Sequence, residues 1–73
     1  MFYVIEITTY NNGTADAYGV YAKSTLDSAI ATFHQKMAGA INNSTYASEL
    51  CMVIDGHGIT QRTEYYERPI GDE

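Results

Sequence analysis

The chain begins with the alternation of side chains that is typical of a β-strand. Over residues 1–10, one face would carry Tyr3, Ile5 and Ile7, and the other Phe2, Val4, Glu6 and Thr8. Asn-Gly at 12–13 tolerates the positive φ of a tight hairpin, so residues 14–22 are expected to return as a second strand. Gly19 inside that strand indicates a bulge or the close approach of another backbone.

The period changes between residues 23 and 43, where apolar residues recur at spacings of three and four, as on one face of an amphipathic helix. That face carries Leu26, Ala29, Ile30, Phe33, Met37, Ala40 and Ile41. We expect Ser24 to cap the helix, with Asp27 three positions later as an acidic capping box. The polar run 42–44 is expected to end it.

Strand character resumes over residues 45–55, and the Asp-Gly-His-Gly run at 55–58 predicts a turn into a last strand over 59–68. The order is therefore β-β-α-β-β. This pattern predicts an α+β fold, with a four-stranded antiparallel sheet and one amphipathic helix on one face. Residues 1–70 would form a single domain and 71–73 a loose C-terminal tail.

One helix can cover only one face of this sheet, yet the predicted strands carry apolar residues on both faces. A 73-residue chain has a marginal core, and its single cysteine excludes a disulfide within the chain. Its seven tyrosines belong to a residue type favoured at interfaces. We therefore expect a homo-oligomer, dimeric or higher, with interface candidates Phe2, Val4, Ala31, Ala38 and Gly39.

Nine acidic and four basic residues give a formal charge of −5, which disfavours direct nucleic-acid binding because that requires clustered Lys and Arg. The first residues lack the pattern of a signal peptide, and no stretch approaches the ~20 apolar residues of a membrane span. We expect a cytoplasmic protein without membrane contact. Cys51, among apolar neighbours, is expected to be a buried, reduced thiol.

The chain carries no recognisable catalytic or metal-binding motif. Cys51 has no His or Asn at a suggestive spacing, and the carboxylates are scattered. Asp55 and His57 fall short of the three or four ligands that zinc takes, and a turn accounts for them. The sequence therefore predicts no enzyme activity, no metal and no cofactor.

Two groups of residues are candidates for binding a ligand. The segment Lys23-Ser24-Thr25 at the predicted helix start combines a cation, hydroxyls and free amides, as in phosphate sites, although a plain cap also explains it. The last strand offers two guanidinium groups for phosphates and a ring that can stack on a base; these residues are Arg62, Tyr66 and Arg68. Cross-strand ion pairing is the alternative for the arginines.

His34 lies at the border of the apolar helical face, on a flank with the small residues Ala31 and Ala38. With Gly39 beside them, a neighbouring backbone or a flat ligand can approach the helix closely there. The alternative is a boundary histidine that is hydrogen-bonded to a loop or a partner. His34 is therefore a further candidate for binding a ligand.

Residues 1–22, 31–58 and 63–68 resemble a group of small uncharacterised proteins encoded by gut Firmicutes and by their phages and prophages. The most distinctive parts are F-H-x-K-M at 33–37 and Y-A-S-E-L at 46–50. The group has no settled activity, so the resemblance carries over no catalytic residues. It implies a bacterial host cytoplasm and a mobile-element setting, where small proteins often counter host defences by binding.

These observations favour a non-enzymatic homo-oligomeric binding protein that sequesters a nucleotide signal between its subunits. The alternatives are an acidic inhibitor that blocks a host protein, since acidic surfaces complement basic clefts, and a structural protein with no small ligand.

Overall fold

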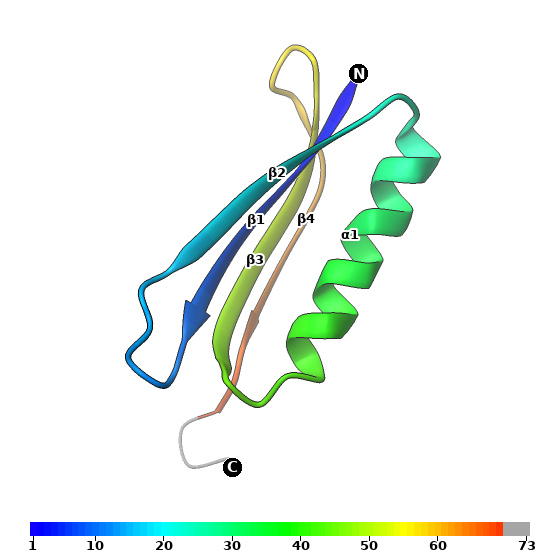
Figure 1. Cartoon of the computed structure of the whole chain (residues 1–73). Helices are drawn as coiled ribbons and strands as arrows, with labels where there is room; N and C mark the ends of the chain where they lie inside the picture. Colours follow the sequence, from blue (N-terminus) through cyan, green and yellow to red (C-terminus); the bar gives the residue numbers. More distant parts are fainter. Residues whose placement is uncertain (70–73) are drawn as a thin grey trace.

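The computed structural model describes residues 1–69, which form one antiparallel sheet with one helix packed along one of its faces (Figure 1). The elements in chain order are β1 (Phe2–Tyr10), β2 (Ala17–Lys23), α1 (Leu26–Ile41), β3 (Tyr46–Asp55) and β4 (Thr60–Glu67). The predicted α+β fold and the order β-β-α-β-β are thus confirmed. The predicted tail at 71–73 lies outside the described residues.

The strands lie side by side in the order β2-β1-β3-β4, so β1 and β3 form the centre of the sheet. Val4 of β1 is paired with Tyr21 on one side and with Val53 on the other. Because alternate side chains of a strand point to opposite faces, this register assigns every residue of the sheet to one of two faces. The face under α1 carries Phe2, Val4, Glu6 and Thr8 from β1.

The hydrophobic core lies between α1 and this face of the sheet. It consists of Val4, Ala29, Phe33, Met37, Cys51 and Val53, with Phe2, Tyr21 and Tyr66 packed against it. Cys51 is fully buried, as predicted, and burial raises the pKa of its thiol to about 12. Leu26 and Ile41 were expected on the buried face but are exposed, because they are the terminal residues of α1.

Two interface predictions are wrong for the same reason. Val4 is fully buried beneath α1 within one chain, and Phe2 packs against the same core. Both faces of the first strand are apolar, so the sequence alone did not indicate which face the helix covers. The helix covers the face that we had assigned to a partner, and the face with Tyr3, Ile5 and Ile7 is left uncovered.

The helix begins one residue later than its sequence pattern indicated. Thr25, not Ser24, is the N-cap: it has an extended backbone, and its Oγ1 accepts a 3.1 Å hydrogen bond from the amide of Ser28. Asp27 therefore lies in the first turn, where its charge is favourable next to the positive end of the helix dipole.

The predicted tight turn between β1 and β2 is a longer loop that spans residues 11–16. Gly13 has the expected positive φ of 87°. Asn11, however, donates hydrogen bonds from its backbone to Thr45 O and from its side chain to Ser44 O. These contacts bind the start of the loop to the segment before β3, and β2 begins only at Ala17.

The turn between β3 and β4 has the predicted chemistry. Oδ1 of Asp55 accepts hydrogen bonds from the amides of His57, at 2.8 Å, and Ile59, at 3.0 Å. These two bonds hold the pKa of Asp55 below its ordinary value. Gly58 supplies the positive φ that closes the turn.

Candidate functional site

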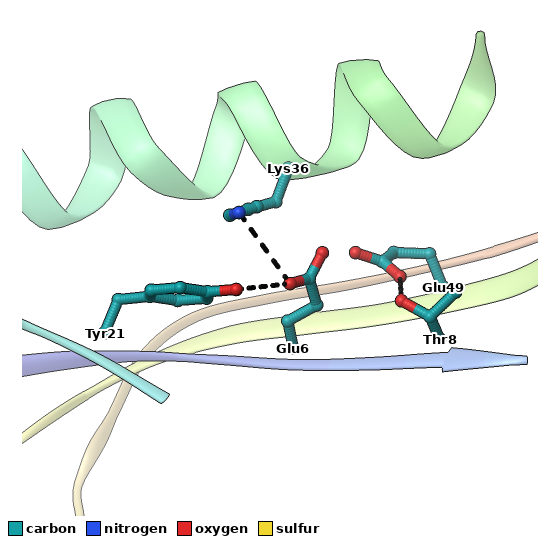
Figure 2. Close-up of polar contacts among 5 residues, drawn as sticks. All are labelled: Glu6, Thr8, Tyr21, Lys36 and Glu49. Atoms are coloured by element: carbon teal, nitrogen blue, oxygen red, sulfur yellow. Dashed lines mark hydrogen bonds and ion pairs between the residues drawn. The ribbon is translucent and has the colours of Figure 1, made fainter. Parts of the chain in front are cut away.

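Two glutamates lie next to each other on the sheet face that α1 covers. Glu6 of β1 is paired with Cys51, and Glu49 of β3 is paired with Thr8, so the two glutamates are diagonal neighbours across the central strand pair. Figure 2 shows their carboxyl groups pointing toward one another beneath the helix. The register of β1 on β3 thus creates a carboxyl pair from residues that are remote in the sequence.

Glu49 is fully buried. Its Oε1 accepts a short hydrogen bond from the hydroxyl of Thr8, whereas its Oε2 has no hydrogen-bond partner among the described residues. Burial, followed by the neighbouring Glu6 carboxyl, raises the pKa of Glu49 to about 7. A buried carboxyl of this kind favours its protonated form because the charged form loses its hydration.

Glu6, in contrast, is well supplied with partners. Tyr21 donates a 3.0 Å hydrogen bond to Oε1 of Glu6, and Lys36 Nζ lies 3.9 Å from the same oxygen (Figure 2). The Lys36 ammonium also lies 4.3 Å from the centre of the Tyr21 ring. The contact with Tyr21 raises the pKa of Lys36, and the Glu6 charge adds to this effect. Among the described residues, Glu6 therefore has, beside its hydroxyl donor, a cation that Glu49 lacks.

A cleft of about 480 Å³ opens beside this pair, between α1 and the sheet. Its lining residues are Glu6, Tyr21, Gln35, Lys36, Gly39, Ala40, Asn43 and Tyr46. Tyr46 packs edge-on against Tyr10, with ring centres 5.2 Å apart, and burial raises its pKa. The cleft is open to solvent, and its lining is mostly polar, with one acid and one base.

The sequence pattern alone does not reveal this site. Glu6 was placed on the same strand face as Phe2 and Val4, and an acid among core positions is a signal of a buried polar contact. Its partners Glu49, Tyr21 and Lys36 come from three other elements. Only the strand register and the docking of α1 bring them together.

The predicted phosphate-binding residues do not meet within one chain. Lys23 ends β2, and the Thr25 hydroxyl is used as the helix cap. Arg68 lies at the other end of α1, a 16-residue helix that spans about 24 Å. Arg62, exposed on β4, is paired with Val53.

Arg68 has a structural use at the C-terminal end of the helix. Its Nη2 donates to the carbonyl oxygens of Ala40, Ile41 and Asn43, and its Nε donates to Tyr46 O. The guanidinium also lies 5.6 Å from the centre of the Tyr66 ring. Its hydrogen-bonding capacity is therefore directed to the backbone that follows α1.

Three of the helical candidates lie on the solvent side of α1, and the fourth, Gly39, lines the cleft. His34 is exposed, and its ring meets that of Phe33 edge-on at 5.3 Å. Ala31, Ala38 and Gly39 are exposed as well, and a Cβ added at Gly39 would meet no atom within 4 Å. The surface around His34 is therefore open, as the small residues indicated.

The sheet face opposite α1 is apolar and uncovered. Its rows across the sheet follow from the register: Tyr18, Ile7, Leu50 and Tyr65 in one, and Val20, Ile5, Met52 and Thr63 in the next. Tyr18 is 84%, Val20 61% and Tyr65 57% exposed. Among the described strands, Glu67 at the end of β4 is the only charged residue on this face.

Within residues 1–69, no group of three His, Cys, Asp or Glu side chains is placed to hold a metal ion. The helix of the described chain is too short and too polar to cross a membrane. No protein-family model, no curated protein and no solved structure matches this chain. Any functional conclusion therefore depends on the geometry of the chain itself.

Proposed function

We propose that this chain is a non-enzymatic binding protein that acts as a homodimer, with the uncovered sheet faces of two copies packed together. The observation that carries the proposal is the apolar surface over β2, β1 and β3, which Tyr65 extends onto β4. Three strands about 4.8 Å apart and three rows of side chains about 7 Å apart give a patch of roughly 300 Å², to which Tyr65 adds. The largest apolar patch on a monomer is about this size and is often functional.

The pattern of this face suits a second copy. Aliphatic side chains of β1 and β3 fill its centre, and tyrosines Tyr18 and Tyr65 lie at the two edges of the same row. A two-fold rotation about the strand direction places a tyrosine edge on a tyrosine edge and the aliphatic centre on itself. Such self-matching is what a two-fold interface requires.

The distribution of charge also supports a second copy of the chain as the partner of the uncovered sheet face. The chain carries a formal charge of −5, so two copies repel each other wherever their acidic surfaces meet. The uncovered face carries charge only at Glu67, at its end. Packing through this face therefore buries apolar area from both copies and keeps most acidic residues apart.

Face-to-face packing leaves both helices on the outside, with the two clefts pointing away from each other. The residues that the sequence suggested for nucleotide binding, such as Lys23 and Arg68, also lie on the outer, helix-bearing sides of the two copies. This arrangement favours the alternative of an acidic outer surface that blocks a basic surface of another protein. In the mobile-element setting that the sequence resemblance implies, that protein would be a component of host defence.

The mass in solution, measured by light scattering, tests the dimer. The wild-type chain should have twice its mass of 8.1 kDa. Val20→Lys introduces a charge at an exposed position of the face and should yield a folded monomer. Ile41→Lys changes an exposed apolar residue of α1 and serves as the matched control, which should remain dimeric. A wild-type chain that stays a folded monomer at high concentration would overturn the proposal.

A further inference from the structure

Oε2 of Glu49 is a fully buried acceptor without a donor among the described residues. Native proteins rarely leave such an atom unpaired, because it has lost its water and gained nothing in return. The nearby donors are used elsewhere: the Thr8 hydroxyl binds Oε1 of Glu49, and the Tyr21 hydroxyl binds Glu6. Lys36 approaches Oε1 of Glu6 from the helix side.

The group that faces Oε2 is the carboxyl of Glu6, itself an acceptor (Figure 2). Two ionised carboxylates facing each other in a buried site repel strongly, whereas a carboxylic acid donates a hydrogen bond to a carboxylate. A proton on Oε2 of Glu49 is the group that satisfies both oxygens. No atom from outside the chain is needed.

We propose that Glu49 carries a proton on Oε2 and donates a hydrogen bond through it to the Glu6 carboxyl. The two carboxyls then form a single proton-bridged pair beneath α1. The pair then bears one negative charge, which the ammonium of Lys36 balances from the helix. Loss of the bridging proton leaves two negative charges against one positive charge. The proton therefore joins β1 to β3.

The other titratable groups on this side of the sheet do not replace that proton. They are Tyr10 on β1, Tyr21 and Lys23 on β2, Tyr46, Cys51 and Asp55 on β3, and Arg62, Glu64 and Tyr66 on β4. Burial raises the pKa of both Cys51 and Tyr46, so these groups are neutral at physiological pH. Lys36 is the one cation in contact with the pair among the described residues.

Release of the proton has a consequence for the cleft beside the pair. Glu6 and Lys36 line that cleft, and with Glu49 protonated their charges cancel. Once Glu49 ionises, the net charge at this wall becomes −1. The raised pKa of Glu49 places this change close to neutral pH. Because an ionised Glu49 has lost its hydration, the stability of the fold should fall as the pH rises, while the cleft becomes more acidic.

The unfolding midpoint, measured at a fixed protein concentration over about pH 5.5 to 8.5, tests the proposal. The wild-type midpoint should fall as the pH rises through neutrality. Glu49→Gln places an amide N–H where the bridging proton was and cannot titrate, so its midpoint should stay nearly constant. Glu64→Gln, an exposed glutamate on the same sheet face, should follow the wild type.

Both variants retain His34 and His57, so a pH dependence caused by histidine would persist in Glu49→Gln. An equal fall in wild type and Glu49→Gln would overturn the proposal. A second measurement needs no variant: the side-chain carboxyl of Glu49, followed by carbon NMR in the wild-type protein, should titrate near neutrality. Titration in the ordinary glutamate range, about 4.3, would refute the bridge.

Discussion

The hydroxyl of Tyr21 lies 3.0 Å from Oε1 of Glu6, and this hydrogen bond connects the edge strand β2 to the carboxyl pair. The ring reaches Glu6 by crossing the backbone of Gly19, where an added Cβ would lie 2.8 Å from the Tyr21 oxygen. The pairing of β1 with β2 has no register shift at Gly19. Gly19 is therefore not at the bulge that its sequence context allowed; it makes room for a side chain of its own strand.

Gly19→Ala should therefore destabilise the protein, although Gly to Ala in a strand is usually favourable. The new methyl group displaces the Tyr21 hydroxyl and breaks a hydrogen bond to a charged acceptor, which contributes about 1.5 to 3 kcal/mol. The alanine also lowers the conformational entropy of the unfolded chain, which offsets part of this loss. We therefore expect the free energy of unfolding to fall by about 1 kcal/mol. Urea unfolding at neutral pH measures it.

The control for this prediction is the same change in a Tyr21→Ala background. Without the ring, Gly19→Ala meets no side chain and should be neutral or stabilising. The two substitutions would then show a coupling energy of about 1 kcal/mol or more. Additive effects would show that Gly19 and Tyr21 act independently and would contradict the prediction.

Arg68 should contribute to stability through its shape as well as its charge. Its fork donates to four carbonyl oxygens at the end of α1 and the start of β3. Lys keeps the charge but offers one nitrogen, so Arg68→Lys should lower the free energy of unfolding by about 1 to 2 kcal/mol.

Arg62→Lys is the matched control, because Arg62 is exposed and forms no hydrogen bond or ion pair with a side chain of the described chain. It should change the free energy of unfolding by less than about 0.5 kcal/mol. Equal effects of the two substitutions would mean that water replaces Arg68 at the carbonyl groups without loss.

Cys51 should be inert toward alkylating reagents in the folded protein. The thiol is fully buried, so the reagent cannot reach the sulfur. Burial also raises the pKa of the thiol to about 12, so the reactive thiolate is scarcely populated. Mass spectrometry after a pulse of iodoacetamide should find an unmodified chain in buffer and a fully modified chain in denaturant. Rapid labelling in buffer would indicate that the core between α1 and β3 opens frequently.

The raised pKa of Glu49 also sets the size and sign of the expected pH effect. An acid whose pKa is higher in the folded state than in the unfolded state stabilises the fold at low pH, and this contribution is lost as the pH rises through the folded pKa. A rise from 4.5 to about 7 corresponds to about 3 kcal/mol. In denaturant titrations the loss should extend from about pH 4.5, the ordinary value, to about pH 7, and the stability should level off above that.

Local patterns in the sequence were enough for the type and order of the secondary-structure elements. The three-and-four spacing of apolar residues predicted α1, strand alternation predicted β1, and the Asp-Gly-His-Gly run predicted the turn between β3 and β4. These features depend on neighbours within a few residues, because side-chain direction repeats with the period of each element. The burial of Cys51 followed in the same way from its apolar neighbours.

Tertiary structure decided which face of the sheet is covered and which polar groups meet. The sequence placed apolar side chains on both faces of β1, so only the docking of α1 could assign Val4 to the core and Ile5 to the uncovered face. Glu6 and Glu49 become neighbours through the register of β1 on β3. Such pairings depend on contacts between segments far apart in the chain, which local periodicity does not encode.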